Sequence, residues 1–439
     1  MVFALWAGVL GTDAHGQVPA QVKLSVSPEA EIRVRIDVLR PGQSWSFRNA
    51  YAGALGIADR ISEFKAFSPT AGEVSARRIA TGEYRSDARA TAISYVVRLS
   101  PPTPANVAHV SWLIGDSGCL MLGDLLPELT LPVHINFSLP AGWTAQSTAD
   151  HDQHGRYLLA EPENAIFLVG RSLRKQWQKV DGVWFASVLD GEWAFKDDAV
   201  LKAAAEVLRK YLALTGFKLH RAAVMIAPLP AVIGSVKWRA ETRGSTVVLL
   251  MDPQAKIGNW KGQLGVIFTH ELLHLWAPNS LRLQGDYDWF FEGFTLYTAL
   301  VTALELKFID FDEYVATLGR VYDSYLSRED RLSLIDASER RWTTGNSAVY
   351  DKGMLVAFLY DLAIRRDSGG KKWLGSLYKD LFAASATQPA SGNEVIIKLL
   401  SSTPSGADLA KSYIEGTREL DLKPLLSDRK QLRKSFYNR

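Results

Sequence analysis

The five residues His270-Glu271-Leu272-Leu273-His274 constrain the fold of this chain more than any other segment. They have the form H-E-x-x-H, which places both histidines on one face of a helix, because side chains four residues apart are neighbours there. Two imidazoles on one face can bind a single metal ion, with the glutamate beside it. The apolar residues around the motif indicate a buried helix, which we expect from about Trp260 to Trp276, since Pro278 prevents its continuation.

A third ligand follows downstream. Glu292 lies in the aromatic segment Trp289-Phe290-Phe291-Glu292-Gly293, which reads as the first turn of a second helix. Two histidines and a carboxylate, with a fourth position left for water, are typical of catalytic zinc. Glu271 is placed to take a proton from water that the metal activates and to pass it to a leaving amine. The pattern therefore predicts a zinc hydrolase with one zinc ion on His270, His274 and Glu292, rather than a chance match on a buried helix.

The composition is that of an ordinary globular protein. Hydrophobic residues make up 47% and charged residues 22% of the chain. Its length of 439 residues is enough for two or three domains with a large core. A formal net charge of +3 gives no electrostatic case for binding nucleic acid or an anionic membrane. Cys119 is the only cysteine, so no intrachain disulfide can form, and its apolar surroundings indicate a buried structural thiol.

The N-terminal residues 1–16 resemble a secretory signal peptide. An apolar run up to Gly11 is followed by small residues, although no Lys or Arg precedes the run. The run is too short to span a bilayer, and no other segment is long and apolar enough for a membrane helix. We therefore expect a periplasmic or secreted protein, and the alternative is a cytoplasmic protein that begins with a buried strand.

The hydrophobic pattern divides the chain into a strand-rich and a helix-rich part. Between about residues 21 and 177, short alternating or β-branched segments are separated by Pro and Gly, which predicts an all-β domain. Residues 190–308 mix both patterns, with a helix expected at 197–214 and strands at 222–227 and 245–251.

Residues 309–439 read as helical throughout. Asp310 opens a helix with the pattern of a capping box, and another helix is expected at 347–366, before Gly369-Gly370. The three predicted domains, 21–177, 190–308 and 309–439, give an α+β fold.

With these motifs in place, the chain resembles the glycyl aminopeptidase family of gluzincin zinc metallopeptidases, which are related to aminopeptidase N. The resemblance covers roughly residues 191–426. The zinc helix with its following Leu275-Trp276 and the segment Phe291-Glu292-Gly293-Phe294-Thr295 are similar to the family's metal-binding motifs. Tyr350-Asp351-Lys352-Gly353 is similar to the start of the helix that carries the catalytic tyrosine, and residues 413–417 are similar to a closing helical motif.

The resemblance implies a thermolysin-like catalytic domain behind an N-terminal β domain, and a zinc-dependent aminopeptidase that acts on peptides or proteins. It implies that Tyr350 donates to the oxyanion and that Glu241 binds the free amine of the substrate. The chain departs from the family around Glu241, where Lys237-Trp238-Arg239-Ala240 replaces glycines and Thr242 replaces a histidine. A tight, glycine-lined substrate edge is therefore not expected.

Several alternatives stay open at this point. One is an endopeptidase or oligopeptidase on the same scaffold, if Glu241 does not reach the substrate's terminus, since its place before a strand is also typical of a solvated turn residue. Another is a non-catalytic, zinc-containing peptide-binding protein, against which the intact Glu271 argues. A structural zinc site is disfavoured because such sites normally have four protein ligands. Asp286 and Asp288 are the nearest acids that could support the zinc histidines, and the oligomeric state stays open.

Overall fold

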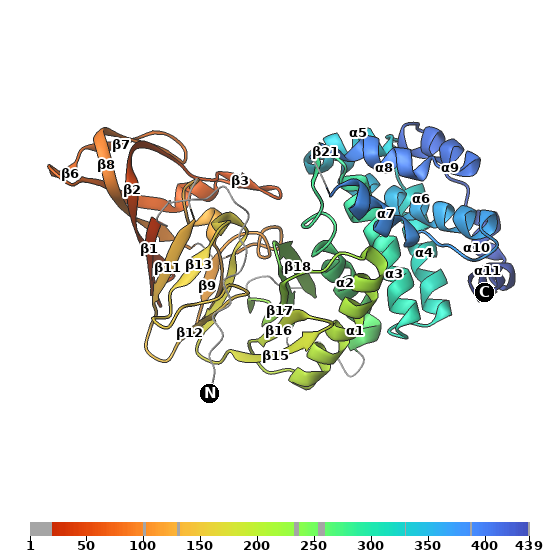
Figure 1. Ribbon diagram of the computed structural model, residues 1–439, viewed down its shortest axis with the longest axis horizontal. Coiled ribbons are helices and arrows are strands. Elements are labelled where there is room, and N and C mark those ends of the chain that lie inside the picture. Colours follow the sequence, from red (N-terminus) through yellow and green to blue (C-terminus); the bar gives the residue numbers. More distant parts are fainter. Residues whose placement is uncertain are drawn as a thin grey trace. The chain divides into compact units, whose positions relative to one another are not determined.

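The computed structural model describes residues 20–99, 102–129, 132–231, 237–252, 260–329, 331–386 and 389–437. The predicted signal peptide, residues 1–16, lies outside these residues. The chain forms two compact units, Met1–Pro102 with Val110–Arg171 and Thr103–His109 with Ser172–Arg439 (Figure 1). Among the described residues, no helix is both long and apolar enough to span a membrane.

The first unit consists of strands, as predicted. Its eight-stranded sheet has the order β13-β11-β1-β2-β8-β5-β6, with β7 paired to β8, and its four-stranded sheet has the order β12-β14-β10-β9. The strands of the larger sheet are β1 (Ala20–Ser27), β2 (Glu31–Ser46), β5 (Ile61–Ser68), β6 (Gly72–Val74), β7 (Ala76–Ala80), β8 (Glu83–Arg98), β11 (Val133–Ser138) and β13 (Tyr157–Leu159). Those of the smaller sheet are β9 (Trp112–Ile114), β10 (Ser117–Met121), β12 (Thr144–Gln146) and β14 (Ile166–Gly170). A two-stranded ribbon and three 3₁₀ turns complete the unit: β3 (Ala50–Tyr51), β4 (Ala54–Leu55), η1 (Ile57–Arg60), η2 (Leu122–Asp124) and η3 (Pro162–Asn164).

Strand β2 is longer than the sequence indicates. Pro41-Gly42 reads as a break, but the strand continues to Ser46 with a register irregularity between Asp37 and Gly42. A bulge tolerates a proline because the irregular position does not need its backbone N–H.

A buried ion pair stabilises the interior of this unit. The Asp124 carboxylate lies 2.7 Å from Arg60 Nη2, and it accepts hydrogen bonds from the backbone N–H and the hydroxyl of Ser111 at 2.7 and 2.6 Å. The carboxylate is thereby paired and hydrogen-bonded, which is the condition for burying a charge without a large penalty. Cys119 is buried in the same unit, as expected for a structural thiol.

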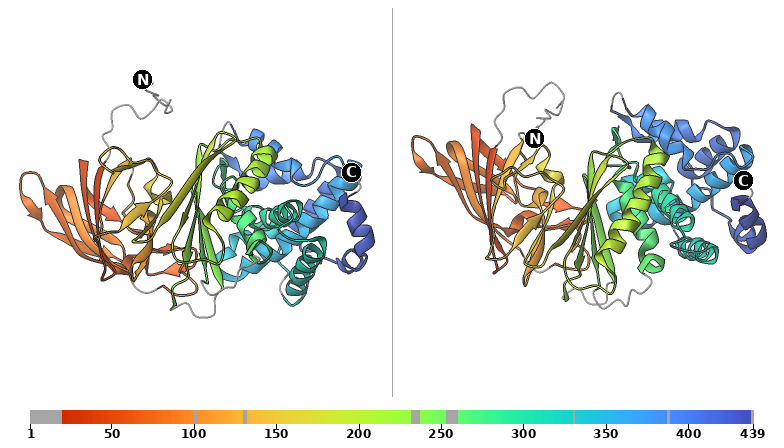
Figure 2. Two further views of the ribbon diagram at one scale, coloured as in Figure 1. Left: turned by 90° about the horizontal axis from the view of Figure 1, so that it is seen from below. Right: turned by 60° about the horizontal axis from the view of Figure 1, so that its bottom comes forward.

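The second unit contains a five-stranded mixed sheet of order β15-β16-β17-β19-β18. Its strands are β15 (Arg174–Val180), β16 (Val183–Leu189), β17 (Arg221–Pro228), β18 (Trp238–Arg243) and β19 (Thr246–Met251). The central strands β16, β17 and β19 are parallel, and helix α1 (Asp197–Thr215) connects β16 to β17 and packs on one face of the sheet (Figure 2). The expected helix and the two expected strands are confirmed.

Strand β18 corrects one expectation. The segment that contains Glu241 read as a turn before the next strand, but it is itself the edge strand of the sheet, paired antiparallel with β19. Its mixed polar sequence lacks the apolar alternation of a half-buried strand, so periodicity did not reveal it. Gly244, with φ of 52°, makes the tight turn between the two strands.

Helices fill the rest of the second unit. They are α2 (Trp260–His274), α3 (Thr295–Glu305), α4 (Phe311–Leu326), α5 (Leu334–Glu339), α6 (Asn346–Asp367), α7 (Ser376–Ala384), α8 (Gly392–Leu400), α9 (Pro404–Leu409), α10 (Lys423–Ser427) and α11 (Arg429–Tyr437). Three π-helical turns, η5 (Trp289–Phe294), η6 (Arg341–Gly345) and η7 (Ala410–Ile414), and the short strands β20 (Leu283–Gln284) and β21 (Ala390–Ser391) complete it. The capping box at Asp310 is present, with Glu313 N–H donating to its side chain.

One hydrophobic core joins the sheet, the helices α1 and α2 and the C-terminal helices. The α+β class predicted from the sequence is confirmed. The boundaries 21–177, 190–308 and 309–439 stay predictions of domain organisation, although β15 already pairs with β16 in the mixed sheet of the second unit.

Candidate metal centre

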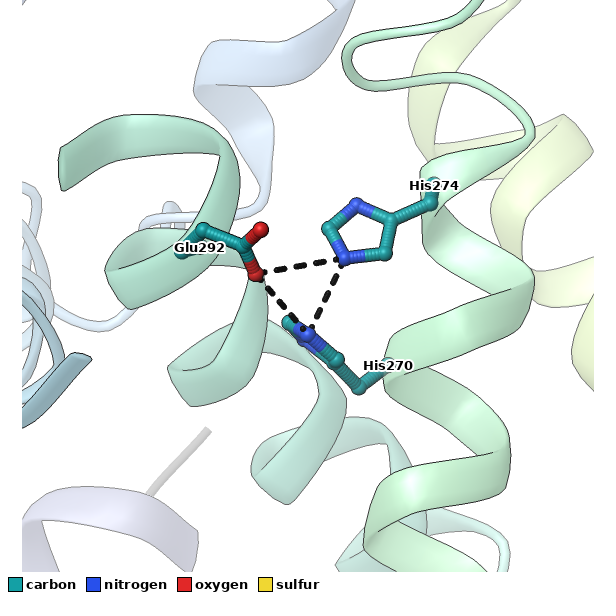
Figure 3. A group of neighbouring side chains, drawn as sticks. All are labelled: His270, His274 and Glu292. Atoms are coloured by element: carbon teal, nitrogen blue, oxygen red, sulfur yellow. Dashed lines mark hydrogen bonds and ion pairs between the residues drawn. The ribbon is translucent and has the colours of Figure 1, made fainter. Parts of the chain in front are cut away.

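Helix α2 supplies two of the three predicted metal ligands. His270 and His274 lie one turn apart on it, and their rings converge with the carboxylate of Glu292 (Figure 3). The two Nε2 atoms are 3.0 Å apart, and both residues are buried. Phe268 and Leu272, half a turn away, are packed in the hydrophobic core, which fixes the orientation of the histidine face.

Glu292, on the π-helical turn η5, completes the group. Its Oε2 lies 3.3 Å from His270 Nε2 and 3.4 Å from His274 Nε2. This oxygen is buried and, among the described residues, has no hydrogen-bond partner. A tetrahedral zinc ion with bonds of about 2.0 Å separates its ligand atoms by roughly 3.3 Å, close to the observed separations. The residues therefore fit zinc, and no other group of three or more His, Cys, Asp or Glu side chains with such separations occurs in the described part of the chain.

Two glycines allow the site to form. A Cβ atom on Gly293 would lie 2.5 Å from the Gly353 Cα, and a Cβ atom on Gly353 would lie 3.0 Å from the Gly293 Cα. Only glycine therefore fits at this crossing of η5 and α6 without moving the backbones apart. Gly293 and Gly353 thus allow η5, which carries Glu292, to pack directly against α6, which carries Tyr350.

Hydrogen bonds hold both rings with Nε2 facing Glu292. His274 Nδ1 donates to the carbonyl of Ala277 at 2.9 Å, which leaves Nε2 as an acceptor for a metal. His270 Nδ1 lies 3.4 Å from the hydroxyl of Thr295, which itself donates to backbone carbonyls of η5. The sequence had offered Asp286 and Asp288 for this role. The structure instead uses a carbonyl and a threonine hydroxyl.

The charge of Glu292 dominates the electrostatics of the group. Burial alone would lower the pKa of His274, but the Glu292 carboxylate outweighs it and raises that pKa to about 9. Burial alone would raise the pKa of Glu292, but His274, His270 and Arg341 hold it well below its ordinary value. The three donor atoms therefore favour a positive charge between them, which a metal cation supplies.

Glu271 lies on α2 beside the metal ligands and is partly exposed. Its Oε2 accepts a hydrogen bond of 2.8 Å from the hydroxyl of Thr242 on the edge strand β18. Thr242 is the residue that stands in place of the family's histidine, and the sequence gave no sign of this contact. The bond fixes one oxygen of the Glu271 carboxylate.

Tyr350 lies in the first turns of α6, next to an arginine that the sequence analysis missed. Arg341 Nη2 donates to the Tyr350 hydroxyl at 3.2 Å and to Glu292 Oε1 at 2.6 Å. Burial, to which the negative charge of Glu292 adds, holds the pKa of Tyr350 well above its ordinary value. The hydroxyl therefore keeps its proton and can donate it in a hydrogen bond.

Glu241 lies on β18 and is buried, with 9% of its surface exposed, so the alternative of a solvated turn residue is wrong. Its Oε1 accepts a hydrogen bond from Arg243 Nε at 2.9 Å, and its Oε2 lies 2.5 Å from His109 Nδ1. Burial alone would raise the pKa of Glu241, but His109 and Arg243 hold it below its ordinary value. His109 is a second residue that the sequence analysis did not single out. It comes from the segment Thr103–His109, which belongs to the second unit.

No protein-family model matches the sequence, and no curated protein sequence matches it. Solved structures do. An aminopeptidase N family protein from Idiomarina loihiensis is similar with a TM-score of 0.79 and 18% identity, over 93% of this chain and 78% of that chain. An M1 zinc metallopeptidase from Deinococcus radiodurans is similar with a TM-score of 0.59 and 14% identity, over 92% of this chain and 95% of that chain. A two-domain M1 zinc metallopeptidase mutant bound to L-arginine gives the same values of identity, coverage and TM-score.

At these identities the similarity establishes the fold. It extends over more than nine tenths of this chain, so both units take part in it. The chain therefore has the fold of the aminopeptidase N-related M1 zinc metallopeptidases, as the resemblance of its motifs predicted.

Proposed function

We propose that this chain is a zinc-dependent metallopeptidase, and specifically an aminopeptidase. The buried trio His270, His274 and Glu292 is the observation that carries the proposal, because its donor atoms have the types and separations that one zinc ion needs. The intact Glu271 beside it favours a hydrolase over a non-catalytic binding protein, and a group of three protein ligands favours a catalytic over a structural zinc site. The shared fold with aminopeptidase N family proteins supports the same assignment.

His270, His274 and Glu292 would hold a zinc ion, which would supply Lewis acidity that lowers the pKa of water toward neutrality and polarises a carbonyl. Glu271, with one oxygen held by Thr242, takes the proton of the attacking water and returns it to the leaving amine. Tyr350, kept protonated by its surroundings, donates a hydrogen bond to the oxyanion of the tetrahedral intermediate. Each of these roles is a proposal.

Glu241 is our proposed residue for the substrate's free amine. It carries a negative charge, because His109 and Arg243 hold its pKa below its ordinary value, and it lies on β18, the edge strand of the mixed sheet. An ammonium group needs a fixed counter-charge of this kind. The related metallopeptidase mutant bound to L-arginine is consistent with this proposal, since a free amino acid is what an aminopeptidase releases.

The proposal is tested first by metal content and then by substrate form. The purified protein is expected to contain one equivalent of zinc, to lose hydrolysis when a chelator removes it, and to lose hydrolysis in Glu271→Gln while the zinc stays bound. Full activity of the metal-free protein would refute the proposed function. Peptides with a free amine are expected to be cleaved and their N-acetylated forms spared, and equal cleavage of both would refute the aminopeptidase assignment.

We further propose that the protein is exported, on the strength of residues 1–16. Peptides or proteins are its proposed partners, and nucleic acid is not expected. Cell fractionation, with N-terminal sequencing of the mature chain, tests export, and a cytoplasmic protein that keeps residues 1–16 would contradict it.

A further inference from the structure

Arg341 joins two carboxylates and a tyrosine around the metal centre. Its Nη1 donates to the Asp288 carboxylate, and its Nη2 donates to Glu292 Oε1 at 2.6 Å and to the Tyr350 hydroxyl at 3.2 Å. The side chains of Arg341, Asp288 and Glu292 are 11%, 14% and 8% exposed. These bonds are therefore shielded from water, and charge-assisted hydrogen bonds are stronger in the protein interior than in water.

The two oxygens of Glu292 have different partners because of this arginine. Oε1 accepts from the guanidinium, while Oε2 faces the two histidine nitrogens. A carboxylate whose Oε1 is fixed in this way offers one oxygen to a metal. Without the bond, the carboxylate could rotate and either place Oε1 toward the histidines or turn away from them.

The guanidinium is itself held firmly. Its carbon lies 4.6 Å from the ring centre of Trp342 and 5.5 Å from that of Phe291, and Asp288 binds its other end. Glu292 and Arg341 both lie on π-helical turns, η5 and η6. Such turns are rare in proteins as a whole, but those that occur are often at functional sites. The planar fork of arginine can span several acceptors at fixed angles, which a lysine ammonium cannot do.

We propose that Arg341 is a positioning residue of the metal centre, which fixes Glu292 with Oε2 toward the histidines and holds the Tyr350 hydroxyl on the same guanidinium. This inference rests on the proposed zinc peptidase function. Arg341 does not need to touch the substrate or the metal to act. It determines the affinity of the site for zinc through Glu292 and the rate of the chemical step through Tyr350.

The experiment compares Arg341→Met and Arg341→Lys with the wild-type enzyme. Zinc affinity is measured by competition with a chromophoric chelator, and kcat and KM are measured at saturating zinc. Arg341→Met is expected to weaken zinc binding about 10- to 100-fold, the usual effect of removing a residue that orients a metal ligand. Its kcat is expected to fall at saturating zinc, with KM little changed, because Tyr350 loses its partner. Arg341→Lys, which keeps the charge without the fork, is expected to recover only part of both losses.

Two further variants separate positioning from folding. Arg365→Met removes another buried arginine, which pairs with Asp361 on α6, and is expected to lower thermal stability while zinc affinity stays unchanged. Asp288→Asn keeps the shape of the side chain that anchors Arg341, and is expected to weaken zinc binding in the same direction but by less. If Arg341→Met does not fold, the zinc affinity of Asp288→Asn tests the positioning role instead.

The outcomes are distinct. Unchanged zinc affinity and kcat in folded Arg341→Met, or full activity and affinity in Arg341→Lys, would overturn the positioning role. A wild-type protein that binds zinc but cleaves no peptide would refute the proposed function alone, since the zinc affinities of the variants would still test Arg341. A wild-type protein that binds no zinc would overturn both.

Discussion

The hydrogen bond between Thr242 and Glu271 makes a sharp prediction about the proposed catalytic base. The Thr242 hydroxyl has one proton and two acceptors on Glu271, the Oε2 at 2.8 Å and the backbone carbonyl at 3.2 Å, and the shorter contact is to the carboxylate. Thr242→Val keeps the shape of the side chain and removes the donor. A hydrogen bond to a charged group contributes about 1.5–3 kcal/mol, so kcat is expected to fall roughly 10- to 150-fold.

The assay is steady-state hydrolysis of a peptide with a free amine, together with the zinc content of each preparation. Zinc is expected to stay at one equivalent, because Thr242 hydrogen-bonds to Glu271 and, among the described residues, to none of the three candidate metal ligands. Thr242→Ser, which keeps the hydroxyl, is the matched control and is expected to stay within a few-fold of wild type. A valine variant with the wild-type kcat would refute the view that this bond positions Glu271.

Three further predictions concern packing and buried charge. Gly293→Ala is expected to lower both thermal stability and zinc content, because its Cβ would lie 2.5 Å from the Gly353 Cα; circular dichroism melting and metal analysis check this. Asp124→Ala is expected to lower the free energy of unfolding by about 3–5 kcal/mol, since it leaves Arg60 buried without its partner, and urea unfolding measures the loss. Burial lowers the pKa of Lys352 from 10.5 to about 8, so the unfolded chain binds more protons than the folded protein between these pH values. Stability is therefore expected to rise over that window by up to about 3 kcal/mol, and Lys352→Met, which cannot titrate, is expected to lose this rise in urea unfolding at pH 8 and pH 10.

The candidate metal ligands were predictable because the sequence signals that mark them are local. His270 and His274 are four residues apart, and helical geometry alone brings them together. Predicting Glu292 as the third ligand required only that a second helix follow nearby, and the pair Glu292-Gly293 marked the position of the ligand. The α+β class likewise followed from a change in hydrophobic period along the chain, which is a local property.

The remainder of the site depends on contacts between distant residues. Arg341 is 49 positions from Glu292, and His109 is 132 positions from Glu241. Neither residue belongs to a spacing pattern, so only the fold reveals what it contacts. Strand β18 was misread for a related reason. An edge strand is stabilised by backbone pairing with its neighbour, and its side chains need no apolar alternation.

The surroundings of Glu241 show what a substrate amine has to overcome. Strand geometry points Glu241 and Arg243 to one face and Thr242 to the other, and Thr242 is the residue that contacts Glu271. Arg243 is 4% exposed and fixed against Glu241, whereas the His109 side chain is 25% exposed. An ammonium group that binds Glu241 therefore has to displace or share the contact of His109 rather than that of Arg243. The comparison of free and N-acetylated peptides therefore also tests whether the contact between His109 and Glu241 can be exchanged for one with the substrate, because a preference for the free amine requires that exchange.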